Sequence, residues 1–132
     1  ECDFFIIWTN DLIQYTVAAE RGNEKISKLY TKYHPSVIRL IKLAIDGAHD
    51  AGIFCGMCGE AAGDELYIPL LIGLGLDEFS MNSNSILKAR KRISELEKFD
   101  CKELAQEVLG LFSAEEVENK LKEFANKKIY KE

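Results

Sequence analysis

The chain has 132 residues and is 47% hydrophobic, which is enough to form one sizeable core and favours a single domain. Its 17 Lys and Arg residues against 22 Asp and Glu give a formal net charge of −5, so the chain has no overall attraction for nucleic acid or anionic membranes. No apolar run approaches the roughly 20 residues that span a bilayer, and the apolar residues 4–8 lack the flanks of a signal peptide. We therefore expect a cytoplasmic protein with no nucleic-acid and no membrane partner.

The first half of the chain predicts a strand, a helix and a second strand. Residues 3–8 form an almost continuously apolar run followed by polar residues, which is typical of a strand buried on both faces. Apolar residues recur at helical spacing over 35–51, where Pro35 starts the helix and Gly52 follows it. Residues 53–58 form another apolar run and predict the second strand.

The next segment predicts a further helix, strand and helix. Residues 64–74 indicate a short helix, with Pro69 in its first turns or at a bend. A third strand is expected at 78–81, and the polar residues 82–85 after it are good N-caps for a helix over 86–96. The strand–loop–helix order therefore occurs three times. This order favours a parallel sheet with crossover helices and with functional residues in the loops after the strands.

The tail from residue 100 differs from the rest of the chain. Its apolar residues predict two amphipathic helices, and Ser113 with Glu116 forms a capping box for the second. Three strands are too few to close a barrel, and an open sheet of three leaves two unpaired edges. We therefore expect an incomplete α/β fold, with strands and helices in residues 1–99 and a helical tail packing on them in residues 100–132.

Taken singly, the polar side chains near the strand ends have structural interpretations. Asp11 is well placed to cap a helix beginning at Leu12. Arg21 is typical of a solvated surface charge, and Cys58 of a small core residue. Cys55 and Cys58 have the spacing of a redox or zinc motif, but they lie in a predicted strand and no second ligand pair follows, which disfavours that interpretation.

Four motifs occur in the order and approximate spacing seen in the phosphoenolpyruvate (PEP)-utilising enzymes: WTNDLIQ at 8–14, ERGN at 20–23, GMCGE at 56–60 and GLGLDEFS at 73–80. The chain resembles enzyme I of the bacterial phosphotransferase system most closely, and the similarity extends into the helical tail. Pyruvate phosphate dikinase and PEP synthase share the pattern more loosely. The resemblance implies that the chain is the C-terminal portion of a (β/α)8 TIM barrel, with about three strand–helix units.

The resemblance also implies roles for four residues. Asp11 matches a carboxylate that binds Mg²⁺, and a hard oxygen ligand at a strand end suits that ion. Asn10 and Arg21 match residues that bind PEP, and a guanidinium can hold a phosphate through two hydrogen bonds. Cys58 matches a cysteine near the C3 carbon of PEP, where a protonated thiol is a suitable general acid.

The partners implied are PEP, a histidine-bearing domain of the same enzyme, a downstream phosphocarrier protein and a second copy in a homodimer. His34 and His49 do not match the family's phosphoacceptor histidine. The chain also departs from the family, because Ile6-Ile7-Trp8 stands where Ser-Ile-Gly is usual. The earlier barrel strands, which supply the second metal carboxylate and further arginines, are expected to be missing, so we expect this chain alone to be inactive.

Two alternatives remain open at this point. The first is a fragment of a PEP synthase or dikinase, which would act with a nucleotide instead of a carrier protein. The second is a non-catalytic dimerisation or interaction module that uses the apolar sheet edges and the amphipathic tail helices.

Overall fold

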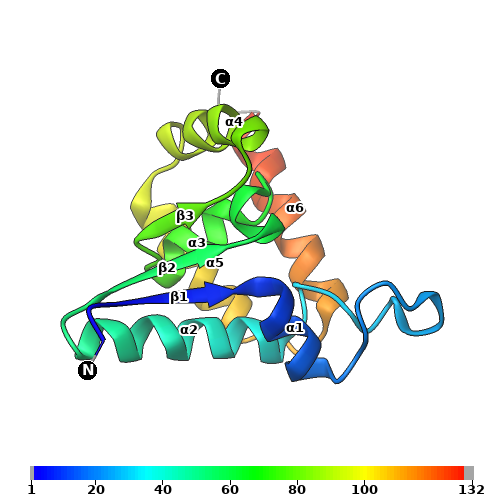
Figure 1. Cartoon of the computed structure of the whole chain (residues 1–132). Helices are drawn as coiled ribbons and strands as arrows, with labels where there is room; N and C mark the ends of the chain where they lie inside the picture. Colours follow the sequence, from blue (N-terminus) through cyan, green and yellow to red (C-terminus); the bar gives the residue numbers. More distant parts are fainter. Residues whose placement is uncertain (1, 130–132) are drawn as a thin grey trace.

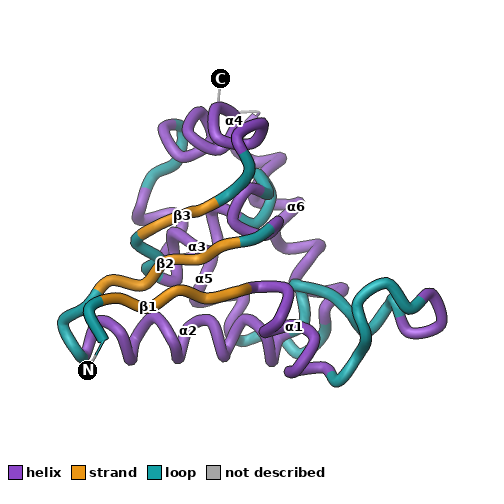
Figure 2. Tube along the Cα trace, viewed as in Figure 1, coloured by secondary structure: helices purple, strands orange, loops and turns teal. Residues whose placement is uncertain are grey.

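A computed structural model describes residues 2–129, and its three strands form one parallel sheet (Figure 1). The strands β1 (Phe4–Trp8), β2 (Phe54–Cys58) and β3 (Glu78–Ser80) pair in the order β1-β2-β3. The helices are α1 (Thr9–Val17), α2 (Pro35–Asp50), α3 (Ile68–Leu74), α4 (Ser83–Ser94), α5 (Lys98–Leu109) and α6 (Ala114–Ile129), with short 3-10 turns η1 (Glu24–Ile26) and η2 (Glu60–Gly63). Each strand is followed by a helix, as predicted, but α1 follows β1 directly and comes before α2, the helix predicted over 35–51 (Figure 2). The last three residues of the predicted tail lie outside the described part.

Local sequence signals set the ends of α2 and α6. Pro35 occupies the first turn of α2, where its missing N–H costs no hydrogen bond, and His34 caps the helix by accepting from Ser36 N at 3.2 Å. At α6, Glu116 N donates to Ser113 Oγ at 3.2 Å and Ser113 N donates to Glu116 Oε2 at 3.0 Å. The predicted capping box is therefore confirmed.

Two predicted helix starts were wrong by several residues. α3 begins at Ile68 rather than at residue 64, because Asp64 forms a turn in which its side chain accepts from Leu66 N at 2.8 Å. Pro69 then lies in the first turn of the helix, where proline is tolerated. α4 begins at Ser83 rather than at residue 86, since the Asn82 side chain caps it.

The core lies on one face of the sheet. Ile7 of β1 and Met57 of β2 are buried in the same cluster as the apolar stripe of α2, which includes Ile41 and Ile45. α3 joins the same core cluster through Leu70, Leu71 and Leu74, and α5 packs closely on α3. A Cβ atom on Gly73 would lie 1.9 Å from the Cys101 carbonyl oxygen, so these two helices approach through a position that only glycine can fill.

The other face of the sheet is more open. Alternation along the strands places Phe4 and Phe54 on this face, where their rings stack with centroids 5.6 Å apart. Both side chains are exposed. Among the described strands, β1 and β3 are the sheet edges. The apolar edge predicted from the sequence is therefore present at β1.

Candidate functional site

A cavity of about 310 Å³ lies at the carboxyl ends of β1 and β2. The parallel register pairs Trp8 with Cys58, which brings the ends of the two strands together. In a parallel sheet this is the edge where loop residues from different strands converge. All four site residues predicted from the sequence line this one cavity, and its full lining is Trp8, Thr9, Asn10, Asp11, Arg21, Cys58 and Gly59.

Asn10 and Asp11 are placed by the direct passage from β1 into α1. The buried Thr9 opens the helix, and its Oγ1 donates to the Cys58 carbonyl oxygen at 3.1 Å, which ties the two strand ends together. Asp11 lies in the first turn of α1, where the helix dipole favours a negative charge. The suggestion that Asp11 caps a helix starting at Leu12 was wrong, because α1 begins at Thr9 and Trp8 is its N-cap residue.

Arg21 reaches the cavity from the irregular segment that follows α1. Its guanidinium Nη2 lies 3.5 Å from Glu60 Oε1, and the two side chains are 55% and 81% exposed. An ion pair this exposed contributes little stability, at most about 1 kcal/mol. Arg21 is therefore held at the cavity by a contact that an anionic ligand can displace.

Cys58 is a half-buried thiol at the end of β2. Burial raises its pKa above the ordinary value, a backbone hydrogen bond opposes this, and the nearby Asp11 charge raises the pKa further. The group therefore carries its proton at neutral pH. The next residue, Gly59, has φ of 118°, a backbone conformation that residues other than glycine rarely adopt. The chain can therefore turn away from the thiol at this point.

Trp8 stands where the resemblance leads one to expect glycine. Its backbone is extended, with φ of −92° and ψ of 98°, a conformation open to any residue. The indole is 64% exposed and borders the cavity at Asp11. It also borders an apolar groove of about 430 Å³ formed with Tyr15 and Leu43. The backbone path of β1 therefore does not require glycine here.

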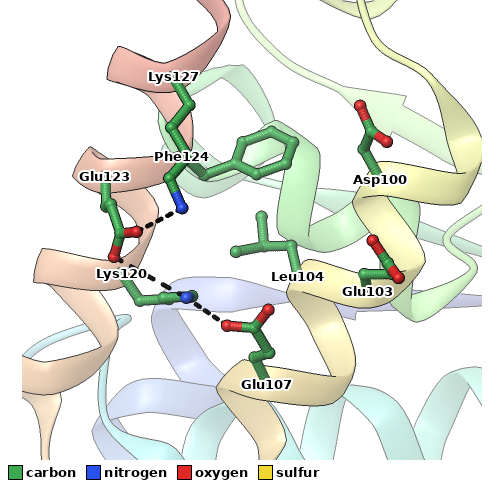
Figure 3. Close-up of a pocket in the computed structure, with 8 residues that line it drawn as sticks. All are labelled: Asp100, Glu103, Leu104, Glu107, Lys120, Glu123, Phe124 and Lys127. Atoms are coloured by element: carbon green, nitrogen blue, oxygen red, sulfur yellow. Dashed lines mark ion pairs between the residues drawn. The ribbon is translucent and has the colours of Figure 1, made fainter.

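A second cavity of about 310 Å³ lies between α5 and α6 (Figure 3). Lys120 pairs with Glu107 and lies 3.8 Å from Glu123, which also accepts an ion pair from Lys127 at 2.6 Å. Figure 3 shows both lysines directed at these carboxylates. Because its cations are already matched by acidic groups, this cavity is a poor place for a phosphate.

Comparison with known proteins identifies the family. A family model described as the PEP-binding domain of PEP-utilising enzymes matches residues 1–98. The chain belongs to the PEP-utilising enzyme family. The phosphoenolpyruvate-protein phosphotransferases of Listeria monocytogenes, Bacillus subtilis and Staphylococcus aureus are each 56% identical to it over 117 residues, which is 89% of this chain and 20% of each relative. The chain thus spans a fifth of the length of these relatives.

Membership of the PEP-utilising family settles the fold class. The parallel sheet with its following helices is the C-terminal portion of a (β/α)8 barrel, as the sequence predicted. No helix within residues 2–129 is long and apolar enough to cross a membrane.

Asp11 is the residue of the cavity that suits Mg²⁺ as a ligand. Residues 2–129 contain no group of three or more His, Cys, Asp and Glu side chains that could hold a metal ion. Mg²⁺ is commonly held by one or two carboxylates together with substrate phosphates. Asp11 at the cavity wall fits that pattern as one such ligand.

Two residues at this site have partners that the sequence did not reveal. The hydroxyl of Tyr30 donates to the Asn10 carbonyl oxygen at 3.0 Å, and Glu60 pairs with Arg21. Tyr30 lies 20 residues from Asn10 in an irregular segment, where no periodic pattern indicates a contact. Glu60 belongs to the GMCGE motif, but the motif does not indicate that its side chain pairs with Arg21.

Proposed function

We propose that this chain forms one side of the PEP site of a phosphotransferase that moves phosphate from PEP to a protein histidine. The observation that carries the proposal is the convergence of Asn10, Asp11, Arg21 and Cys58 on one cavity at the carboxyl end of the sheet. The name of the relatives supports it, because phosphoenolpyruvate-protein phosphotransferases are 56% identical to this chain.

Asn10 and Arg21 are the proposed phosphate ligands. The Asn10 carboxamide donates one hydrogen bond, and the planar Arg21 guanidinium donates two, which suits a pair of phosphate oxygen atoms. Arg21 exchanges Glu60 for the more highly charged phosphate on binding. Asp11 would hold Mg²⁺, and the ion when bound supplies positive charge to the phosphoryl oxygens.

Cys58 is the proposed general acid. When the phosphoryl group passes to the histidine nitrogen, the P–O bond of PEP breaks and its electron pair stays on the enolate of pyruvate. The enolate C3 carbon then takes the thiol proton, which gives pyruvate and a Cys58 thiolate. The raised pKa of Cys58 supports this role, because the proton is present before the step at neutral pH and returns readily from water afterwards.

The proposed partners rest on the resemblance to the phosphotransferases. A histidine-bearing domain of the same enzyme accepts the phosphoryl group, and a phosphocarrier protein receives it next, in the cytoplasm.

We also propose a homodimer, which sedimentation of the full-length enzyme tests. A monomer at micromolar concentration would refute that part of the proposal.

The chain alone is expected to bind PEP poorly. PEP carries two anionic groups, a carboxylate and a phosphate. The cavity offers one cationic side chain, Arg21, and one carboxylate, Asp11, so one of the two anionic groups has no cationic partner there. Isothermal titration of this chain with PEP and Mg²⁺ should give no submillimolar binding. Its single tryptophan, Trp8, borders the cavity, so its fluorescence gives an independent reading of the same titration.

The function itself is tested in a hybrid enzyme. This chain replaces the matching segment of the Bacillus subtilis relative, and PEP-dependent phosphorylation of the enzyme's own histidine is measured. We expect activity in the hybrid and a loss of roughly 10- to 150-fold in kcat/KM with Arg21→Gln, since hydrogen bonds to charged groups contribute about 1.5–3 kcal/mol. The matched control is Arg90→Gln, an exposed arginine on α4. Equal losses in the two variants would refute the proposal.

A further inference from the structure

The segment between α1 and α2 projects from the sheet and returns to the site at Tyr30 (Figure 1). Tyr30, Asn10 and Glu60 line a cavity of about 270 Å³ beside the one that holds the predicted site residues. The segment is also fixed near Tyr30 by an ion pair from Lys32 to Asp64. The tyrosine ring is therefore held against the first turn of α1 from outside that helix.

The Tyr30 hydroxyl meets both oxygen atoms of Asn10. It donates to the backbone carbonyl oxygen at 3.0 Å and lies 3.4 Å from the side-chain Oδ1. Burial raises the Tyr30 pKa, Arg21 opposes this, and the charges of Glu60 and Asp11 raise the pKa further. The hydroxyl thus keeps its proton at neutral pH and remains a donor to oxygen.

This contact favours one orientation of the Asn10 carboxamide. The hydroxyl has one proton, which the two oxygen atoms share, with the backbone carbonyl oxygen as the nearer acceptor. An amide side chain has an acceptor end and a donor end, so the shared bond favours Oδ1 toward Tyr30 and Nδ2 on the opposite side. A Cβ atom placed on Gly59 would lie 3.9 Å from Asn10 Nδ2, so the amide group faces Gly59 and the cavity wall next to Cys58. The donor end of Asn10 is therefore directed at the cavity that Arg21 and Cys58 also line.

We propose that Tyr30 is a positioning residue that fixes the Asn10 carboxamide with its N–H groups toward the phosphate. The inference rests on the proposed function, because it takes Asn10 as a phosphate ligand. Without the Tyr30 hydroxyl the carboxamide is free to rotate by half a turn. In the rotated state it presents Oδ1 to the phosphate. The partial negative charge on Oδ1 and the negative charge on the phosphate oxygen atoms then repel each other.

The test is a double-mutant cycle in the hybrid enzyme with PEP as the probe. Asn10→Ala should raise KM for PEP roughly tenfold or more, and Tyr30→Phe should raise it roughly three- to tenfold. Because Tyr30 acts through Asn10, adding Tyr30→Phe to Asn10→Ala should change KM no further. Tyr15→Phe is the matched control, since Tyr15 is 83% exposed on α1 and outside the site cavity.

The outcomes separate the inference from the proposed function. If Asn10→Ala leaves KM unchanged, Asn10 is not a ligand and that part of the proposed function fails. If Asn10→Ala weakens binding but Tyr30→Phe does not, or if the two effects multiply, the positioning role is overturned.

A second measurement does not depend on the hybrid being active. In ¹⁵N–¹H spectra of this chain, Tyr30→Phe should shift the side-chain amide signals of Asn10 and leave those of Asn84, on α4, in place. Unchanged Asn10 signals would overturn the proposal whatever the kinetics show.

Discussion

The two ends of the same parallel sheet are built from different interactions. At the carboxyl ends, Asp11 and Cys58 border a cavity, and Arg21 is held there by an exposed ion pair. At the amino ends, Asp77 precedes β3 and satisfies two partners at once. Its Oδ2 accepts from Cys55 N at 2.8 Å and lies 2.7 Å from His49 Nε2.

The polar groups at one end of the sheet face a cavity, and those at the other end bond to one another within the chain. Asp77 joins α2, β2 and β3 through hydrogen bonds made inside the chain, and its pKa is lowered first by the Cys55 backbone hydrogen bond and then by His49. The cavity at the opposite end keeps polar groups directed at space for a ligand. In barrel enzymes the carboxyl face carries the reaction and the amino face carries stability, and the cavity and the Asp77 contacts lie at the corresponding ends of this sheet.

The largest effect should follow from Cys58→Ala at the carboxyl end. Loss of a general acid is expected to lower pyruvate formation in the hybrid enzyme by roughly 10²- to 10⁴-fold. The affinity for Mg²⁺ should stay within about twofold, because the thiol is not a proposed ligand. Cys2→Ala, an exposed thiol outside the cavity, is the control. Turnover equal to that of the parent would remove the acid role from Cys58.

Asp77→Ala should affect stability instead. It leaves the Cys55 N–H and His49 without their acceptor, which should lower the free energy of unfolding of this chain by about 1–3 kcal/mol. Urea denaturation measures the change, and Asp50→Ala, an exposed carboxylate at the end of α2, should stay within about 0.5 kcal/mol of the parent. An unaltered midpoint for Asp77→Ala would contradict the division between the two ends.

The lowered pKa of Asp77 makes the stability contributed by the amino end of the sheet depend on pH. Since the folded chain holds the pKa below its ordinary value of 3.8, the ionised carboxylate stabilises the fold above that pH. The contribution is lost as the pH falls from 3.8 through the lower folded pKa. Between about pH 4 and pH 2 the parent should therefore lose more stability than Asp77→Asn, which does not titrate. Parallel losses in the two proteins would show that Asp77 has no part in acid unfolding.

The sequence was informative where local signals decide structure. Apolar runs located β1 and β2, the strand expected at 78–81 matches β3, and the Ser113–Glu116 pair located the start of α6. The four site residues could be named from the family resemblance. Parallel pairing brings together the strand ends near Asn10, Asp11 and Cys58, whereas Arg21 reaches the cavity from the segment after α1. Their roles in PEP binding and catalysis stay predictions.

Contacts formed through irregular segments were not predictable. The Tyr30 hydroxyl bond to Asn10 depends on the path of a loop that has no repeating pattern. The turn at Asp64 displaced the start of α3 for a similar reason, because one side-chain acceptor competed with the helix. Asp77 gave no signal either, since its partners come from α2 and β2.

The smallest expected effect tests whether the carboxyl end has any stabilising bond of its own. Thr9→Val keeps the shape of the side chain but removes the hydroxyl that donates to the Cys58 carbonyl oxygen at 3.1 Å. It should lower the free energy of unfolding by about 0.5–1.5 kcal/mol, less than Asp77→Ala, since one neutral hydrogen bond is lost. Thr9→Ser retains the hydroxyl and should recover part of that loss in the same urea titration. If Thr9→Val destabilises the chain as much as Asp77→Ala does, the carboxyl end contributes equally to stability and the contrast between the two ends is wrong.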